Sequence, residues 1–292
     1  MKIVIPNDSQ QTIGGGWSFR NNLTKGVRKI GSAEIVEKIE DADIVLIAGA
    51  TMVSRDTVGM ANALGKKIVL RIDNIPRNSR NRNTGTSRLR DFAAAAHAIV
   101  YQSQWAKNYI MPFVGKDGPI IYNGIDTNIF NEGIIGAGNV FIPGDKHNFG
   151  GDPTYLYSRY NRDETKRWEE AWYEYQMIQR EQTKAKLVIV GNFSPEQIEY
   201  NFDFFFGEHF EYLGIADNEE EMAKIYRGCD YFLAVYYNDC YSNTYQEALA
   251  CGCELWKPNL SGGTEELIRN GPIPLEKMTQ DYLNLFEEVI KK

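Results

Sequence analysis

The chain has 292 residues, a formal net charge of −7 and a hydrophobic fraction of 43%. An acidic balance disfavours a broad contact with nucleic acid, so no nucleic-acid partner is expected. No apolar run reaches the roughly 18 residues that span a bilayer, and the first ten residues turn polar too soon for a signal peptide. We therefore expect a cytoplasmic protein without a transmembrane segment.

Short β-branched segments alternate with segments of helical spacing in the first half of the chain. This alternation is typical of βαβ units on a parallel sheet. We expect strands at residues 2–6, 42–49, 66–72, 96–101 and 119–124, and helices at 54–65 and 103–113. Residues 131–153 are rich in Gly, Asn and Asp, and they are expected to form a linker and the irregular start of a second unit.

The same alternation resumes after the linker. Strands are expected at 154–159, 185–191, 209–214, 230–236 and 253–258, with helices at 163–182, 218–228 and 242–252. The final segment is amphipathic, and we expect it to pack one face on the body of the protein. Its apolar residues near helical spacing are Leu275, Met278, Tyr282, Leu285, Phe286 and Val289.

Two doubly wound units are the architecture that this pattern favours. We predict an α/β fold in which two Rossmann-like domains face each other across a cleft, the first spanning 1–135 and the second 136–275, with the packed helix at 276–292. Ligands of open α/β sheets bind at the carboxyl ends of the strands, so we expect the chemistry in that cleft.

Four cysteines, at 229, 240, 251 and 253, lie in the last quarter of the chain. Cys251 and Cys253 form C-x-C rather than C-x-x-C, and the three histidines stand far apart. This spacing disfavours a structural zinc site. We expect small buried thiols and no bound metal.

Three consecutive glycines, Gly14 to Gly16, stand between the first expected strand and a helix. That position suits an anion that approaches the free amides of a helix start. The dinucleotide fingerprint is incomplete, because Phe19 occupies the place of its third glycine. A tight turn and a phosphate-binding loop both remain open on this evidence.

A stronger pattern lies at residues 238–252, where an apolar strand passes into a helix. Asp239 and Glu247 are acidic residues eight positions apart, and the backbone amides of Ser242, Asn243 and Thr244 lie between them at the helix start. The structural alternative is a capping box in which Glu247 closes back on the amide of Thr244.

This segment resembles the donor-binding signature of retaining glycosyltransferases of family 4, which have the GT-B fold. In that family two acidic residues are separated by seven others, and the second begins the segment Glu-Ala-x-Ala-Cys-Gly. Here the sequence is D-CYSNTYQ-EALACG, in which Asp239 stands in place of the usual Glu and Glu247 matches the second acidic residue. Residues 122–130 (YNGIDTNIF) and 261–268 (SGGTEELI) are similar to two further family segments. The resemblance covers residues 119 to about 270 well and the first 118 more loosely.

The resemblance implies a hexosyltransferase that moves a sugar from a nucleotide-diphosphate sugar, linked to UDP or GDP, to a hydroxyl acceptor with retention of configuration. It implies no metal and no other cofactor. Residues 155–172 are similar to the stretch that supplies an Arg and a Lys to the donor phosphates. Arg159 takes the Arg place and Lys166 the Lys place at a spacing two residues longer than usual, with Arg162 and Arg167 as alternatives.

The other implied contacts follow the same alignment of motifs. The amides at 242–244 would join Arg159 and Lys166 on the diphosphate. Glu247 would bind the ribose hydroxyls, and Asp239 the donor sugar beside the reacting carbon. Gly15 and Gly16 are expected to come closest to the donor.

An arginine-rich run lies at residues 71–92. Such a run is typical of a solvated loop, and the alternative is a receptor for an anionic acceptor, such as a lipid phosphate or an acidic glycan. Asp73 ends an expected strand and is a candidate to contact the acceptor hydroxyl as a base. The expected partners are thus a nucleotide sugar and a glycan or lipid-linked acceptor, with peripheral membrane contact left open.

Other functional classes fit parts of the pattern. A catalytically weak or inactive nucleotide-sugar-binding protein of the same fold is the main alternative, because Asp239 departs from the family. A GT-B phosphorylase or epimerase and an NAD-linked oxidoreductase are further alternatives. Chain length disfavours the phosphorylase, and the missing third glycine disfavours the oxidoreductase.

Overall fold

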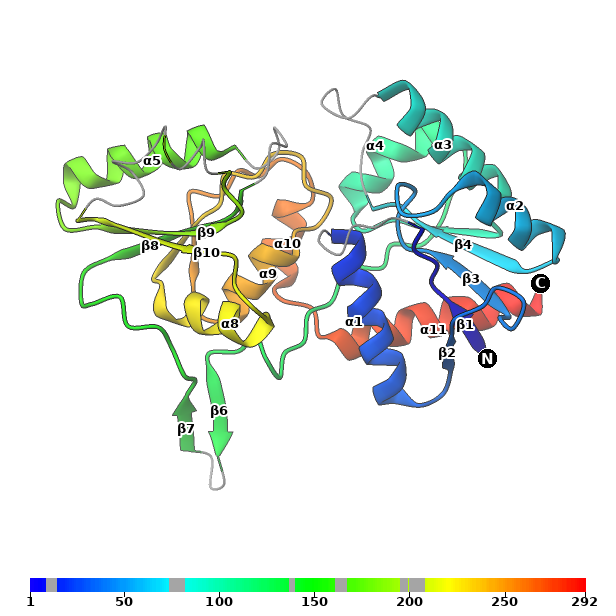
Figure 1. Cartoon of the computed structure of the whole chain (residues 1–292), viewed down its shortest axis with the longest axis horizontal. Coiled ribbons are helices and arrows are strands. Elements are labelled where there is room, and N and C mark those ends of the chain that lie inside the picture. The colour runs from blue at the N-terminus through cyan, green and yellow to red at the C-terminus, as the bar shows by residue number, and fades with distance from the viewer. Residues whose placement is uncertain (9–14, 74–81, 137–139, 161–166, 195–198, 200–207) are drawn as a thin grey trace. The chain divides into compact units, whose positions relative to one another are not determined.

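The structure, a computed structural model, divides into two compact units (Figure 1). The first comprises Met1–Ile125 together with Glu265–Lys292, and the second comprises Asp126–Thr264. The structure describes residues 1–8, 15–73, 82–136, 140–160, 167–194, 199 and 208–292, without the side chains of 82–86, 134–136, 140–143, 159 and 160.

The first unit is built on a parallel sheet with the strand order β2-β1-β3-β4-β5. Strands that are covered on both faces must be apolar throughout, and every residue of the central Ile44–Ile47 strand is buried. The strands are β1 (Lys2–Val4), β2 (Glu34–Val36), β3 (Ile44–Ile47), β4 (Lys67–Arg71) and β5 (Ala98–Val100).

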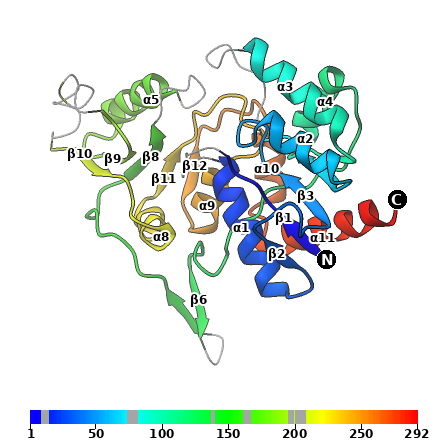
Figure 2. The ribbon, with the colours of Figure 1, turned by 45° about the vertical axis from the view of Figure 1, so that its right-hand side comes forward.

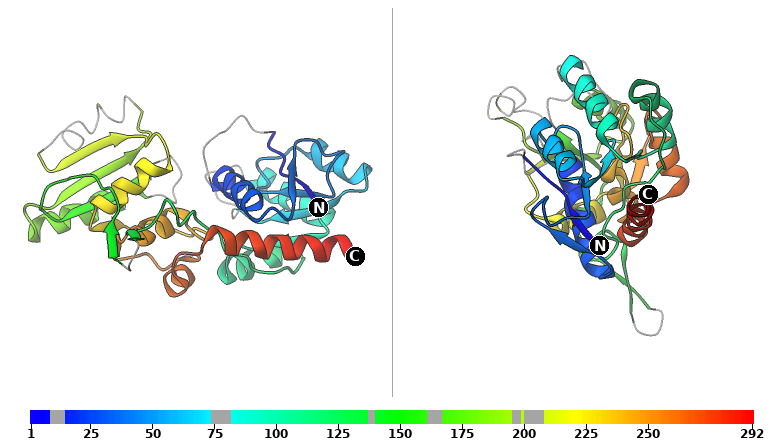
Figure 3. Two further views of the ribbon diagram at one scale, coloured as in Figure 1. Left: turned by 90° about the horizontal axis from the view of Figure 1, so that it is seen from below. Right: turned by 90° about the vertical axis from the view of Figure 1, so that its right-hand side faces the viewer.

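Helices cover both faces of this sheet. On one face, α1 and α11 lie side by side, and α2, α3 and α4 pack in sequence on the other (Figures 1 and 3). Ser54 and Ser103 are the N-caps of α2 and α4, and each side chain accepts a hydrogen bond from an amide of the first turn. The bounds are α1 (Gly15–Ile30), α2 (Arg55–Ala63), α3 (Arg82–Ala95), α4 (Gln104–Val114) and α11 (Leu275–Lys291).

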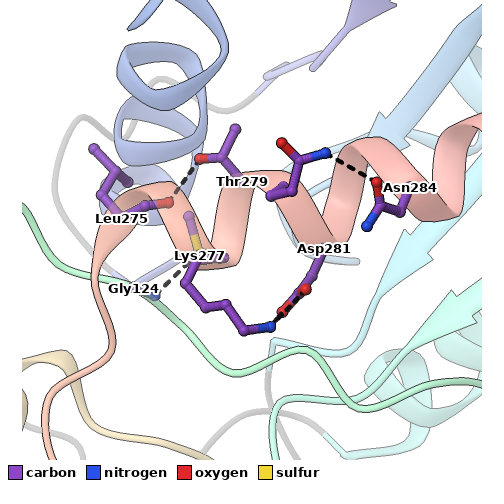
Figure 4. Close-up of polar contacts among 8 residues, drawn as sticks. Gly124, Leu275, Lys277, Thr279, Asp281 and Asn284 are labelled. Atoms are coloured by element: carbon purple, nitrogen blue, oxygen red, sulfur yellow. Dashed lines mark hydrogen bonds and ion pairs between the residues drawn. The ribbon is translucent and has the colours of Figure 1, made fainter. Parts of the chain in front are cut away.

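The C-terminal helix α11 is an integral layer of the first unit. Its amphipathic face is buried as expected, except that Leu283 is buried where the pattern favoured Leu285, which is half-buried. The helix also holds the chain as it leaves this unit, since the Gly124 amide donates to Sδ of Met278 at 3.1 Å (Figure 4). On its exposed side, Lys277 pairs with Asp281 one turn later.

The second unit repeats the same parallel topology, with the strand order β10-β9-β8-β11-β12 (Figure 2). α5 covers one face of the sheet, and α8 and α9 cover the other (Figure 1). The strands are β8 (Thr154–Tyr160), β9 (Lys186–Gly191), β10 (Phe210–Gly214), β11 (Tyr231–Leu233) and β12 (Glu254–Trp256); the helices are α5 (Trp168–Glu181), α8 (Glu219–Gly228) and α9 (Asn243–Ala250).

The prediction of two doubly wound parallel α/β units is therefore confirmed, with local differences. Residues 119–124 form only one bridge, from Ile120 to Tyr101, rather than a strand. The run at 71–92 is not one loop, because it contains most of α3. Within 131–153, predicted to be irregular, lies the antiparallel hairpin of β6 (Gly133–Gly136) and β7 (Val140–Pro143). The short helix α10 (Thr264–Asn270) was also not predicted.

The order of the strands determines where a ligand can bind to each unit. In an open parallel sheet, the order reverses at one point, and the loops that leave the two strands there diverge to opposite faces. This switch point lies between β1 and β3 in the first unit, and between β8 and β11 in the second. The segments that follow these four strands are therefore the first places to look for a site.

No helix among the described residues is long and apolar enough to cross a membrane.

The contact between α1 and α11 gives a test of the fold. A Cβ on Gly26 of α1 would overlap the Thr279 side chain of α11, lying 2.9 Å from its Cβ, so Gly26→Ala should lower the free energy of unfolding by about 1–3 kcal/mol. Gly59→Ala in α2, where a Cβ meets nothing within 4 Å, should instead stabilise by about 0.5–1 kcal/mol. Urea unfolding of both variants measures the difference, and equal effects would contradict the close α1–α11 packing.

Candidate functional site

The candidate site of the second unit lies where β11 passes into α9, next to the switch point with β8. α9 begins at Asn243, and Ser242 is its N-cap, with a side chain that accepts from the Tyr245 amide at 3.4 Å. Thr244 is therefore the second residue of the helix and not its cap. The capping-box alternative for Thr244 and Glu247 is wrong, because Glu247 stands too far into the helix to close on its start.

Asp239 lies in a turn before the helix, and several hydrogen bonds hold this turn in place. The Tyr241 amide donates to its Oδ1 at 3.3 Å, and its carbonyl oxygen accepts from the Gly263 amide at 2.8 Å. The preceding residue, Asn238, has a φ of 51°, and its amide donates to Oγ of Ser261 at 2.9 Å. These contacts fix the backbone of Asp239 from the segment 261–263, so both motif segments named in the sequence analysis meet here.

Glu247 is a buried carboxylate, with 8% of the residue exposed. Its Oε2 accepts a hydrogen bond from the buried phenol of Tyr226 on α8, at 3.2 Å. A buried carboxylate needs such donors, because desolvation of the charge is costly. The neighbouring helix thus holds Glu247 in one position on the first turns of α9.

The start of α9 carries further buried polar groups. Oδ1 of Asn243 and Oγ1 of Thr244 are buried, and neither has a hydrogen-bond partner among the residues that the structure describes. The backbone amides at the first positions of a helix have no partner within the helix, and the helix dipole makes this end attractive to anions. Ser242, Asn243 and Thr244 therefore form a polar helix start that suits an anionic group.

The structure describes only some of the cations that the sequence predicts to bind phosphate. Arg159 lies on β8, near its carboxyl end at the switch point, and its side chain is outside the described set. Lys166 and Arg162 lie outside the described residues altogether. Arg167 is described: it forms an ion pair with Glu170, and its guanidinium lies 5.3 Å from the centre of the Tyr237 ring.

In the first unit, two of the predicted residues lie close together. Gly14 is outside the described residues, while Gly15 begins α1. A Cβ on Gly16 would lie 2.5 Å from Sδ of Met52 and 3.8 Å from Oδ2 of Asp73. Glycine at position 16 thus leaves room for Met52 and brings the start of α1 near the carboxylate that follows β4.

Sequence reasoning missed a second glycine at this place. A Cβ on Gly49 would lie 2.5 Å from Oδ2 of Asp73, so only glycine lets the carboxylate lie against the end of β3. The only signal was its position directly after the apolar strand segment "IVLIA". Gly16, Gly49 and Asp73 together line the switch point of the first unit.

Arg71 is a correction to the solvated-loop interpretation of the run at 71–92. It is 1% exposed and lies at the end of β4, where its guanidinium donates to the Ala48 carbonyl at 2.7 Å and to Oδ1 of Asn123 at 3.0 Å. It also lies 4.0 Å from the centre of the Phe19 ring. Because Asn123 in turn donates to Gln102, a buried polar chain ties α1, β4 and the segment after β5 together.

Glu266 on α10, which matches the motif at 261–268, has a structural role. Its carboxylate oxygens accept hydrogen bonds from the amides of Gln104 and Trp105 at 2.8 Å each. These amides belong to the first turn of α4, where backbone amides have no partner within the helix. Glu266 therefore anchors the returning chain to the first unit.

The cysteines behave as packed thiols. All four are buried and free, and burial raises the pKa of Cys251 to about 12 and the pKa of Cys229 and Cys253 well above the ordinary value. Cys229, Cys251 and Cys253 are therefore protonated at neutral pH and poor metal ligands. Among the described residues, no group of three or more His, Cys, Asp or Glu side chains is placed to hold a metal ion.

Comparisons with known proteins place the fold. No family model and no curated protein matches the sequence. HepE of Anabaena, solved in complex with UDP-glucose, has a TM-score of 0.67 at 14% identity, covering 100% of this chain and 90% of its own. The sucrose-phosphate synthase of Thermosynechococcus elongatus has a TM-score of 0.62 at 12% identity, covering 99% of this chain and 90% of its own.

A third solved structure belongs to a different class of enzyme. A putative UDP-N-acetylglucosamine 2-epimerase of Listeria monocytogenes has a TM-score of 0.59 at 14% identity, with 98% of this chain and 88% of its own covered. Such likeness over nearly the whole chain shows that this protein has the GT-B fold, with two parallel-sheet α/β units.

The close approach of two loops at Asp239 gives a test. A Cβ on Gly262 would overlap the carbonyl oxygen of Asp239 and lie 2.8 Å from its nitrogen, and the φ of Gly262 is +72°. Gly214 has a similar φ of +71° but open space around it. Both Gly→Ala variants should lose about 1–2 kcal/mol to the left-handed backbone.

Gly262→Ala should lose about 1–3 kcal/mol more than Gly214→Ala, because the added methyl displaces the Asp239 turn. Urea unfolding of the two variants side by side measures this difference. Equal losses of unfolding free energy would mean that the turn moves without cost and that the segment 261–263 does not hold Asp239.

Proposed function

We propose that this protein is a retaining glycosyltransferase of the family 4 type, which transfers a hexose from a UDP- or GDP-linked sugar to a hydroxyl acceptor. The observation that carries the proposal is the junction of β11 and α9. There, an anion-attracting helix start is flanked by the held carboxylates Asp239 and Glu247 at the switch point of the second unit. The GT-B fold and the UDP-glucose in the HepE complex add support.

In the proposed chemistry, one set of groups contacts the leaving diphosphate and another set contacts the sugar. The bond between the anomeric carbon and the diphosphate oxygen breaks, and the nucleoside diphosphate departs with the electron pair. Arg159, Lys166 and the amides at 242–244 would stabilise the charge that builds on it, and each such preorganised donor is worth about 100- to 1000-fold in rate. No metal or other cofactor is required in this scheme.

Carboxylates are suited to the hydroxyl groups of the donor. An ionised carboxylate only accepts hydrogen bonds, so Glu247 would accept from the ribose hydroxyls. Asp239 would accept from hydroxyls of the hexose. Its side chain is one methylene shorter than the Glu typical of the family, so the sugar would have to lie correspondingly closer to the Asp239 turn.

The first unit would serve the acceptor, a glycan or a lipid-linked hydroxyl. Its switch point is lined by Gly16, Gly49 and Asp73. The acceptor oxygen forms the new bond to the anomeric carbon and loses its proton, and Asp73 is the proposed group to take it. Gly15 and Gly16 would let the donor come close to the backbone at the start of α1.

The donor site is tested by binding and turnover. Glu247→Ala and Lys166→Ala should each reduce turnover by at least about tenfold, since charge-assisted contacts are worth about 1.5–3 kcal/mol. Calorimetry with UDP and GDP, and release of nucleotide from UDP-glucose, provide the measurements. Glu181→Ala and Lys184→Ala, at exposed positions of the same unit, are matched controls that should keep full activity.

A folded Lys166→Ala variant with full activity would transfer the phosphate role to Arg162 or Arg167. A wild-type protein that binds neither UDP nor GDP would overturn the proposed function.

The role of Asp73 is tested separately from the donor site. Asp73→Asn keeps the shape of the side chain but cannot accept a proton, so affinity for UDP should change by less than about twofold while sugar transfer falls by about 100-fold. Isothermal titration with UDP, alongside Glu247→Ala, compares the two variants. If Asp73→Asn weakened UDP binding as much as Glu247→Ala does, its acceptor role would be refuted.

Epimerisation is the second candidate, favoured by the Listeria neighbour. An epimerase would convert UDP-N-acetylglucosamine to its C2 epimer, whereas the proposed transferase releases UDP. Analysis of the products from UDP-N-acetylglucosamine and UDP-glucose separates these outcomes. Binding of UDP without any product would indicate the inactive nucleotide-sugar-binding protein.

A further inference from the structure

Two fully buried tyrosines connect the start of α9 with the ends of β11 and β8. The backbone amide of Tyr236, just after β11, donates to Oη of Tyr245 at 2.8 Å. The phenol of Tyr236 donates in turn to the carbonyl oxygen of Ser158 on β8, at 2.5 Å. Both tyrosines are 0% exposed, so these hydrogen bonds are shielded from competing water.

The two phenol rings form a rigid unit. They stack with centroids 4.9 Å apart and an interplanar angle of 21°. Phe232 of β11 packs edge-on against both, at 5.9 Å from Tyr236 and 5.6 Å from Tyr245. Burial raises the pKa of Tyr245 well above its ordinary value, so its phenol stays neutral.

The tyrosine pair holds the groups on which the proposed donor site depends. Tyr245 is the third residue of α9, and its amide is bound by the N-cap Ser242. Ser158 directly precedes Arg159 on β8. The turn at Asp239 lies between the two tyrosines in sequence, and the segment 261–263 holds its other side.

We propose that Tyr236 and Tyr245 are positioning residues that set the distance between the end of β8 and the start of α9 for binding of a nucleoside diphosphate. This inference rests on the proposed function. Preorganised donors work only when they converge on the same anion, and a displacement of about 1 Å can cost about 100-fold in rate. The tyrosines act through Arg159 and the amides at 242–244.

The rival explanation is that the tyrosines only stabilise the unit. Removing a phenol that satisfies a buried backbone group costs stability wherever it occurs. Tyr175 provides the matched control, because it is also 0% exposed and its phenol donates to the carbonyl oxygen of Ala185 at 2.6 Å. Ala185 precedes β9, at the amino end of the sheet and away from the switch-point loops.

The experiment compares Tyr245→Phe, Tyr236→Phe, their double variant and Tyr175→Phe in the full chain. Affinity for UDP is measured by calorimetry, hydrolysis of UDP-glucose gives kcat and KM, and urea unfolding gives stability. All three single variants should lose stability. Tyr245→Phe and Tyr236→Phe should also weaken UDP binding by at least about fivefold and reduce kcat, while Tyr175→Phe stays within about twofold of the wild type.

The double variant tests whether the pair acts as one unit. The effects of two substitutions that act through a common contact do not add. The double variant should therefore lose about as much UDP affinity as the more severe single variant. If Tyr245→Phe fails to fold, Tyr236→Phe breaks only the link to Ser158 and tests the same proposal.

The outcomes separate the two levels of inference. A wild type that binds UDP, with Tyr245→Phe and Tyr236→Phe no weaker in binding than Tyr175→Phe, overturns the positioning role and leaves the proposed function intact. A wild type that binds neither UDP nor GDP overturns both.

Discussion

The reversal of strand order in a fully parallel sheet is the constraint on which the second unit depends. Because α5 covers one face and α9 the other, the segments that leave β8 and β11 diverge, and the helix start at Asn243 is left beside the end of β8. The described groups of the proposed donor site are arranged around this one divergence. Tyr226, Tyr236 and Tyr245 then hold the resulting geometry from inside.

For the proposed diphosphate site, local dipoles matter more than the overall charge of the protein. With a net charge of −7, the whole protein offers no long-range attraction to a diphosphate. In the proposed donor site, the fixed amides at the start of α9 would act on the diphosphate at short range, where the low polarity of a buried surface strengthens their effect. Such a site depends on accurate placement of its groups, and hydrogen bonds hold both the turn at Asp239 and the side chain of Glu247.

The sequence predicted most strands because parallel strands need continuous apolar runs, such as Ile44–Ile47. It missed β2, which has only three residues, and α3, whose polar and arginine-rich start lacks an apolar stripe. Arg71 was interpreted as solvated because its partners, Ala48 and Asn123, are distant in sequence. Gly49 was missed for the same reason, because the Asp73 carboxylate that lies against it is distant in sequence. Tyr245 lies within the motif at 238–252, but nothing in that motif indicates its hydrogen bond with the amide of Tyr236. The role of each predicted site residue remains a prediction that binding measurements must test.

The chain enters the second unit after Ile125 and leaves it after Thr264, so this unit is inserted within the first. During synthesis the second unit is complete before α11 emerges from the ribosome. The apolar face of α1 therefore stays uncovered until then. Gly26, which leaves room for the Thr279 side chain, thus belongs to an interface that forms only after the second unit has been synthesised. Because closing a long loop costs only slightly more than closing a short one, the inserted unit adds little entropic penalty to the docking of α11 on α1.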